Sequence, residues 1–175
     1  MTQESSPMHR EGRPMPPGGG PPRGPGGGPP RGPGAGVAAP QGYAKPLPSI
    51  DEENKPFWEY AKKHELRMQK CPDCGKIYYP PASLCPNCHS WKKSEWVKLT
   101  GKGSVYSFIV ARRATNPAFA KEVPYVVAII ETQEGGRLIS NIVGSKPEDV
   151  KVGMPVEVVF EDITDEITLP KFKPV

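Results

Sequence analysis

The chain has 175 residues, of which 24 are Pro and 19 are Gly, and its formal net charge is +4. Residues 49–175 carry 18 basic and 17 acidic side chains, and this near-neutral balance argues against a surface built for nucleic-acid phosphates. The longest apolar run, YVVAII at 125–130, is far shorter than the ~20 residues of a membrane span, and the N-terminus lacks a secretory signal, which predicts a cytoplasmic protein.

Residues 1–48 differ sharply in composition from the rest of the chain. They hold thirteen Pro and twelve Gly, and the octapeptide GGGPPRGP occurs twice in succession, at 18–25 and 26–33. Glycine does not recur at every third position, which excludes a collagen helix. Because so few apolar side chains cannot offset the entropy of folding, we expect a disordered Pro/Gly-rich tail over 1–48, ahead of one domain or two small modules.

Residues 49–70 are predicted to form a helix with an aromatic side. Pro56 suits the first turn, and Phe57, Trp58 and Tyr60 begin a cluster of large side chains at spacings of three and four. Two interpretations remain open for this cluster. Either the aromatic side packs on the protein's own core, or it faces a partner or a ligand.

All four cysteines lie in the segment CPDCGKIYYPPASLCPNCHS, residues 71–90, as two Cys-x-x-Cys pairs separated by ten residues. Each pair can direct two thiolates at one ion, and the residues between the pairs can form a hairpin that brings them together. We therefore expect a rubredoxin-like zinc ribbon over 71–95 holding one Zn²⁺. Four thiolates fill a tetrahedral ion, so this zinc is expected to be structural rather than catalytic. The ligands would be Cys71, Cys74, Cys85 and Cys88.

Other chemistries compete for the same cysteines. The letters CPNCH, ending at His89, match the attachment pattern of a c-type haem, but that chemistry accompanies export and no signal peptide is present. A redox-active dithiol, iron and disulfides also remain possible in principle. Two equivalent pairs in a reducing compartment favour zinc over all of these. His89 is expected to lie outside the ligand set.

Beyond the cysteines, short stretches rich in Val, Ile, Phe and Tyr alternate with breaks that contain Gly and Pro. The predicted strands are 94–99, 103–113, 124–132, 137–143 and 155–162, and residues 163–170 are read as a break. The run YVVAII predicts a central strand covered on both faces. The fold class is therefore mainly β, with a five-stranded OB-fold barrel over 96–175; an SH3-like barrel remains a competitor.

No catalytic constellation is evident. The histidines lie in the tail, the helix and the ribbon, without a neighbouring nucleophile, and TGKGS at 100–104 lacks the spacing of a phosphate-binding loop. Because OB-folds often bind nucleic acid, a single-stranded nucleic-acid-binding module remains an alternative. Its stacking face would hold Tyr106 and Phe108 beside Arg112 and Arg113.

The order of the elements resembles the zinc-ribbon/OB-fold acyl-CoA-associated protein family of bacteria and archaea. The similarity spans about residues 50–175 and rests on several stretches: KPFWEYAKKHELRMQKC, the cysteine segment, EWVKLTGKGSVYSFIVARR, VPYVVAIIE, EDVKVGMPVEVVFED and LPKFKPV. Members of that family are accessory subunits rather than enzymes. They associate with thiolase-superfamily proteins, and in some pathways with hydratases or aldolases that act on acyl-CoA intermediates.

The resemblance implies a non-catalytic subunit that docks on a thiolase-type enzyme. It would support cleavage or condensation of a 3-oxoacyl-CoA in lipid, steroid or aromatic metabolism, by assembly or by passing the substrate. An accessory subunit of a hydratase or aldolase is the alternative, and a stand-alone CoA-binding module is a further hypothesis. The surface for the partner, or for acyl-CoA at the subunit interface, is expected to involve Phe57, Trp58, Tyr60, Phe119 and Tyr125.

Overall fold

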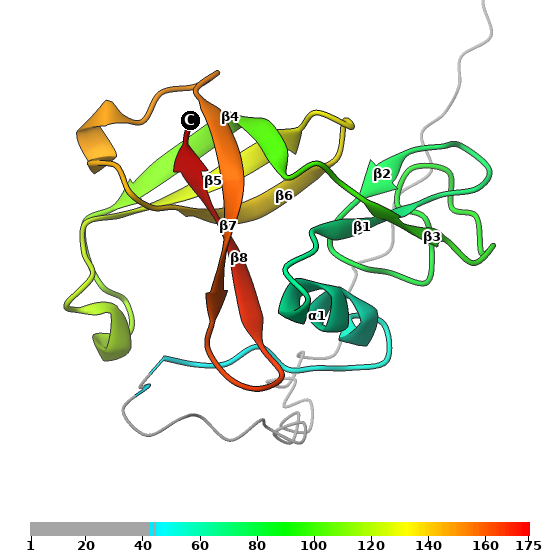
Figure 1. Cartoon of the computed structure of the whole chain (residues 1–175), viewed down its shortest axis with the longest axis horizontal. Coiled ribbons are helices and arrows are strands. Elements are labelled where there is room, and N and C mark those ends of the chain that lie inside the picture. The colour runs from blue at the N-terminus through cyan, green and yellow to red at the C-terminus, as the bar shows by residue number, and fades with distance from the viewer. Residues whose placement is uncertain (1–42, 44) are drawn as a thin grey trace, which may run out of the picture. The chain divides into compact units, whose positions relative to one another are not determined.

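The structure, a computed structural model, describes residue 43 and residues 45–175 (Figure 1). Apart from residues 43 and 45–48, the predicted tail lies outside the described residues. The described elements are α1 (Lys55–Lys62), β1 (Arg67–Lys70), β2 (Ile77–Tyr78), β3 (Glu95–Lys98), β4 (Lys102–Ala111), η1 (Pro117–Phe119), β5 (Tyr125–Thr132), β6 (Arg137–Ile142), η2 (Pro147–Asp149), β7 (Pro155–Asp162) and β8 (Thr168–Pro174).

The helix is much shorter than the predicted range 49–70. It begins with Pro56 in its first turn and ends at Lys62, and His64 then adopts a left-handed conformation with φ of 57°. Residues 67–70 are not helical, because they pair with β3 along their whole length and with β2 at their end. Pairing between distant segments therefore overrides the local helical pattern, and this part of the prediction was wrong.

The ribbon sheet has the order β2-β1-β3, with both pairings antiparallel. The hairpin joins β1 to β2 around the first cysteine pair, whereas the sequence placed it between the two pairs. Strand β3 was predicted within the barrel set as 94–99, but it completes the ribbon sheet instead. The reason is its register with β1, in which Met68 lies opposite Val97 and Gln69 opposite Trp96.

The barrel is closed in the order β4-β5-β6-β8-β7, and β7 pairs back onto β4. The pair β6–β8 is parallel and the other pairs are antiparallel, as in the five-stranded Greek-key arrangement of an OB-fold. The predicted fold class is confirmed. The fifth strand is nevertheless β8, which the sequence reading split between a break at 163–170 and a closing segment. Its Pro and Lys residues hid the strand pattern, and pairing with β7 over seven residues forms it.

One hydrophobic core joins α1, the ribbon and the barrel. Phe57 and Trp58 of the helix pack in the same cluster as Leu66 and Met68 of the ribbon and the inner barrel residues. The rings of Phe57 and Trp58 meet edge to face, with centroids 5.1 Å apart. The inner barrel residues of this cluster include Val105, Val126, Ala128, Ile130, Leu138, Ile142, Val156, Ile167 and Phe172. The helix and the ribbon are thus held on the barrel by apolar burial.

The turn between β5 and β6 is where the barrel meets the ribbon most closely. A Cβ atom on Gly136 would lie 2.7 Å from Cγ2 of Ile77 and 3.0 Å from Cε of Met68. We expect Gly136→Ala to lower the free energy of unfolding by about 1–2 kcal/mol through overpacking. Urea unfolding is the measurement. The matched control is Gly135→Asn, which keeps a residue that tolerates positive φ where no atom lies within 4 Å; an equal loss in both variants would contradict the packing explanation.

Candidate functional site

The four cysteine sulfurs form a compact cluster within the ribbon. All four Sγ atoms lie within 4.8 Å of one another. Cys71 Sγ lies 3.6 Å from Cys88 Sγ, and Cys74 Sγ lies 3.7 Å from Cys85 Sγ. A tetrahedral zinc with Zn–S bonds of ~2.3 Å requires sulfurs ~3.8 Å apart. The geometry of the cluster therefore fits one zinc ion, and it joins the first cysteine of each pair to the second of the other.

The two cysteine turns have nearly the same backbone structure. In the first, the Cys71 N–H donates to the Lys76 carbonyl and the Gly75 N–H donates to the Cys71 carbonyl, both at 2.9 Å. In the second, Cys85 and His89 make the equivalent bonds at 3.0 and 2.9 Å. Gly75 and His89 occupy the same left-handed position, with φ of 69° and 57°. His89 is exposed and serves as a turn residue, so it stands outside the sulfur cluster as expected.

The electrostatics of the cluster favour a bound cation. The backbone N–H of Lys76 lowers the pKa of the Cys74 thiol to about 7. The N–H of Ser90 acts in the same direction on Cys88, but desolvation and the neighbouring sulfurs raise the pKa of that thiol to about 12. Four thiols this close cannot all ionise without a compensating positive charge. A divalent ion supplies that charge, and the donor set of four sulfurs is the one that structural zinc prefers.

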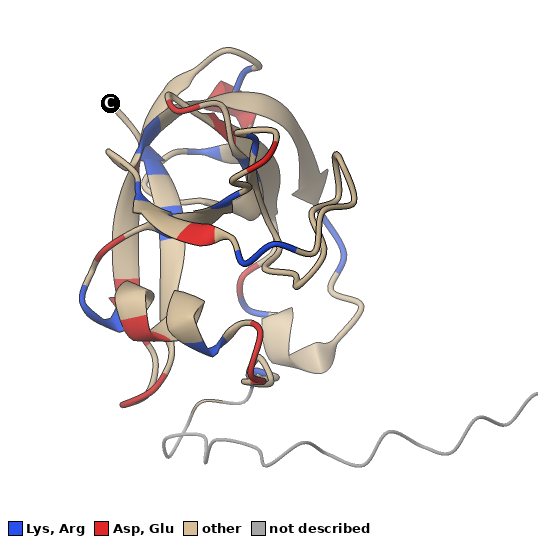
Figure 2. Ribbon diagram, turned by 90° about the vertical axis from the view of Figure 1, so that its right-hand side faces the viewer, with Lys and Arg blue, Asp and Glu red and all other residues tan. Residues whose placement is uncertain are grey.

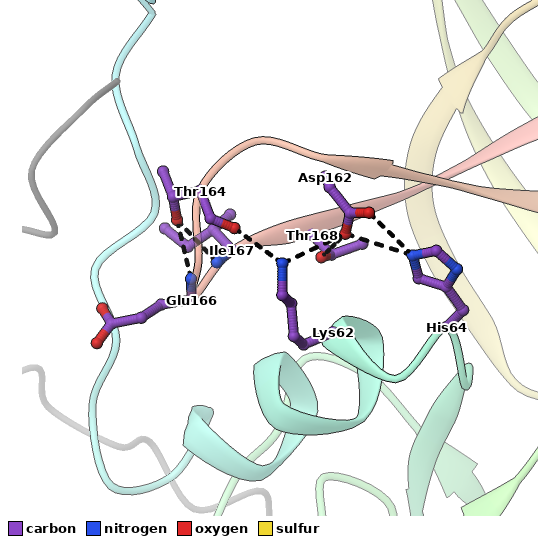
Figure 3. A network of polar contacts seen from close by, with 7 residues as sticks. All are labelled: Lys62, His64, Asp162, Thr164, Glu166, Ile167 and Thr168. Atoms are coloured by element: carbon purple, nitrogen blue, oxygen red, sulfur yellow. Dashed lines mark hydrogen bonds and ion pairs between the residues drawn. The ribbon is translucent and has the colours of Figure 1, made fainter. Parts of the chain in front are cut away.

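A second polar cluster fixes the end of α1 to the hairpin β7–β8 (Figure 3). His64 Nε2 lies 3.2 Å from Oδ2 of Asp162, and its ring stacks on Phe160 with centroids 5.1 Å apart. The Thr168 hydroxyl donates to the same carboxylate, and Lys62 Nζ lies 3.7 Å from it. The histidine faces a carboxylate and no nucleophile, which fits a structural contact rather than a catalytic pair.

This cluster predicts a defined acid sensitivity. The hydroxyl of Thr168 lowers the pKa of Asp162, and His64 and Lys62 add to that effect. A carboxyl group with a lowered folded pKa stabilises the fold above its unfolded pKa of about 3.9 and loses that contribution as pH falls through the folded value. We therefore expect Asp162→Asn to be less stable than the wild type at neutral pH, with the difference shrinking below about pH 4.

Urea midpoints of both proteins between neutral and acid pH test this prediction. Asp165→Asn, an exposed residue of the same hairpin, is the matched control and should leave the pH dependence unchanged. A difference between Asp162→Asn and the wild type that persists undiminished at low pH would rule out the proposed linkage.

The aromatic residues of α1 do not share one environment. Phe57 and Trp58 are 3% and 9% exposed and belong to the core, so their rings are not a free partner surface in this chain. Of the two interpretations left open by the sequence, own-core packing describes these two residues. Tyr60 is half-buried, and the Arg67 guanidinium lies 4.3 Å from its ring centroid.

Phe119 and Tyr125, by contrast, lie together near the surface of the barrel. Their ring centroids are 5.9 Å apart, and Lys45 Nζ lies 5.6 Å from the Phe119 ring and pairs with Glu122. They help line a cleft of about 220 Å³ under the extended segment 45–48. The structure thus separates the two halves of the predicted surface, because the helix aromatics are in the core and this pair is not.

The predicted nucleic-acid face does not carry a free basic rim. The Arg137 guanidinium lies 3.6 Å from the Tyr106 ring centroid and pairs with Glu131, and Arg112 pairs with Glu148. Acidic and basic residues are interspersed on the side turned to the viewer in Figure 2. None of the helices among the described residues has the length and hydropathy of a membrane span.

Two family models match the folded region. One is described as "ChsH2, rubredoxin-like zinc ribbon domain" and matches residues 58–91, and the other is "ChsH2, C-terminal OB-fold domain" and matches residues 96–161. The ribbon match and the sulfur cluster together support one structural zinc in this chain. They favour zinc over the haem, iron, disulfide and redox alternatives.

Curated relatives fall into two groups. A "DUF35 domain-containing scaffold protein" of Methanocaldococcus jannaschii is 42% identical over 67% of this chain and 88% of its own length. A "probable enoyl-CoA hydratase alpha subunit" of Thermomonospora curvata is 42% identical over 74% of this chain. A "3-oxo-4,17-pregnadiene-20-carboxyl-CoA hydratase alpha subunit" of Mycobacterium tuberculosis is 33% identical over 67% of this chain. The chain spans only 40% and 37% of these two hydratase subunits.

Two solved structures are similar. A chain of the "Ltp2-ChsH2(DUF35) aldolase" is 41% identical, has a TM-score of 0.64, and matches over 73% of this chain and 98% of its own length. A DUF35-family protein from Sulfolobus solfataricus, 20% identical with a TM-score of 0.50 over 72% of this chain and 87% of its own, supports the fold alone.

Proposed function

The chain belongs to the ChsH2/DUF35 family, and on that premise we propose that it is a non-catalytic accessory subunit of an acyl-CoA aldolase or hydratase. Its role would be to dock on the catalytic subunit and complete the active assembly. The observation that carries this proposal is the similarity to a chain of an aldolase complex, because 98% of that chain is matched. The names of the two hydratase subunits support the same class of partner.

The described residues supply scaffold chemistry rather than catalysis. The sulfur cluster offers four ligands, which saturate a tetrahedral ion and leave no position for substrate. We propose Cys71, Cys74, Cys85 and Cys88 as these ligands. The His64–Asp162 pair connects α1 to the barrel, and no nucleophilic side chain among the described residues hydrogen-bonds to that histidine. The reacting groups would then belong to the partner.

The nature of the partner differs from the main expectation drawn from the sequence. That expectation named a thiolase first and a hydratase or aldolase second. The printed names of the relatives support the second reading, and none of the relatives described above is named a thiolase. The acyl group handled would be set largely by the catalytic subunit. Direct contact between acyl-CoA and the cleft beside Phe119 and Tyr125 remains a proposal.

The test is an affinity pull-down of the tagged full chain from nuclease-treated extracts of its native cells. We expect an aldolase or hydratase subunit in stoichiometric amount, and an acyl-CoA activity that requires both chains. Recovery of a thiolase would return the first expectation. Recovery of the chain alone or with RNA-binding proteins would overturn the proposal, and calorimetry with CoA and salt-dependent oligonucleotide binding would then test the two remaining alternatives.

A further inference from the structure

Three neighbouring strands of the barrel present an apolar outer face. In the register of β4, β5 and β6, Ile129 lies opposite Ser107 and Ile139, and Val127 lies opposite Ile109 and Asn141. The intervening residues of β5 (Val126, Ala128 and Ile130) are buried inside the barrel. Since side chains alternate along a strand, the other set points outward. We call Ile109, Val127, Ile129 and Ile139 the aliphatic face (strands β4 to β6, Figure 1).

The aliphatic face is exposed in this chain. Ile109 and Ile139 are each 65% exposed, and Val127 and Ile129 are half-buried. The outer face of a solvated antiparallel sheet is normally polar. The sequence predicted a strand covered on both faces at 125–130, and the structure shows that the described chain covers only the inner one. Clustered exposed aliphatic side chains of this kind mark an interaction surface.

The border of the face indicates what kind of surface would cover it. At one end Arg137 stacks on Tyr106 and pairs with Glu131 at 2.8 Å, so the charges there neutralise each other. The Asn141 side chain is engaged by the Val126 carbonyl at 3.1 Å. At the other end lie Tyr125 and Phe119. A face without net charge and with aromatic ends complements an uncharged, apolar protein surface and not a phosphate backbone.

We propose that the aliphatic face is the docking surface for the catalytic aldolase or hydratase subunit, an inference that rests on the function proposed above. The chain of the solved aldolase complex is matched over 98% of its length, while 27% of the present chain has no counterpart in it. The contacts made by such a chain must therefore arise within the ribbon and the barrel. Among the described residues, the exposed large hydrophobic side chains concentrate on this face, with Tyr106, Ile109 and Ile139 all lying on or beside it.

The test measures affinity for the catalytic subunit that the pull-down identifies, purified and titrated against the full chain. We expect Ile109→Glu/Ile139→Glu to weaken binding by at least about 100-fold, because two carboxylates would be buried unpaired in an apolar interface. The matched control is Val152→Glu, which places the same charge at an aliphatic residue that is 67% exposed in the loop before β7. It should change the affinity by less than about threefold.

Two further measurements keep the proposal falsifiable. Zinc content and the thermal midpoint show whether the double variant is folded. Hydroxyl-radical footprinting of the wild-type complex needs no variant, and should show protection of Tyr106, Ile109 and Ile139 but not of Val152. Unchanged affinity in the folded double variant, or no protection in the complex, would overturn the docking surface while leaving the accessory function intact.

Two other outcomes are distinguishable from these. If the double variant turns a dimer of this chain into a monomer without affecting the catalytic subunit, the face binds a second copy and the proposal is wrong. Light scattering after size exclusion detects this. If no aldolase or hydratase subunit is recovered at all, the proposed function fails first, and this inference fails with it.

Discussion

Replacing Cys71 by serine is expected to abolish zinc binding and to destabilise the ribbon. Cys71 is buried, and its sulfur lies 3.6 Å from that of Cys88 across the proposed site. Structural zinc contributes about 10–16 kcal/mol of apparent binding free energy in small modules, and that energy is also folding energy. A serine hydroxyl is a poor zinc ligand at neutral pH, so most of this contribution would disappear.

The effect should spread beyond the ribbon. Leu66 and Met68, just before the first cysteine pair, belong to the same core as the barrel, so a disordered ribbon would uncover apolar surface there. Metal analysis should fall from one zinc per chain to near zero, and the thermal midpoint should drop. The control is His89→Gly, which alters the neighbour of Cys88 at a left-handed position and should keep the zinc. A folded, zinc-free Cys71→Ser that still binds its partner but loses the associated activity would contradict a purely structural metal.

Phe172→Ala is expected to lower the free energy of unfolding by about 3–5 kcal/mol. The side chain is fully buried in the common core, and it lies on β8, opposite Val158 of β7 and Ile142 of β6. Removing the ring would leave a cavity at the position where the parallel pair β6–β8 helps to close the barrel. A loss of this size is a large fraction of the stability of an ordinary domain.

Chemical unfolding followed by far-ultraviolet circular dichroism measures the loss. Val175→Ala, three residues further along and exposed, is the matched control and should change stability by less than about 0.5 kcal/mol. Because Phe172→Ala leaves the cysteines intact, zinc content should remain at one per chain wherever the variant is folded. An unfolding free energy close to that of the wild type would show that β8 is not needed to hold the barrel closed.

Features with a short, local cause were predictable from the sequence. The cysteine turns follow from residues four or five positions apart, and Gly75 with its φ of 69° shows why such a turn favours that residue. The alternation in β5 and β7 likewise predicted strands close to those observed, at 125–132 and 155–162. The family resemblance, carried by the same stretches, extended these local signals to an OB-fold.

Errors arose wherever a distant segment decides the conformation. The helix prediction ran through residues 67–70, which become a strand only because β3 lies beside them. Strand β8 has Pro170 and Lys171 in its pattern, yet β7 supplies partners along its full length. Phe57 and Trp58 were candidates for a partner surface, and the core formed by ribbon and barrel buries them instead.

By itself, the sequence determined the zinc chemistry, the mainly β class and the near-neutral charge, since these depend on which side chains are present and on their spacing along the chain. Only the tertiary structure decided which aromatic residues are core, which strands close the barrel, and that the apolar run at 125–130 has one uncovered face. The physical reason is that burial is a property of neighbours brought together by strand pairing, and period-two alternation does not show whether the outward side of a strand is covered.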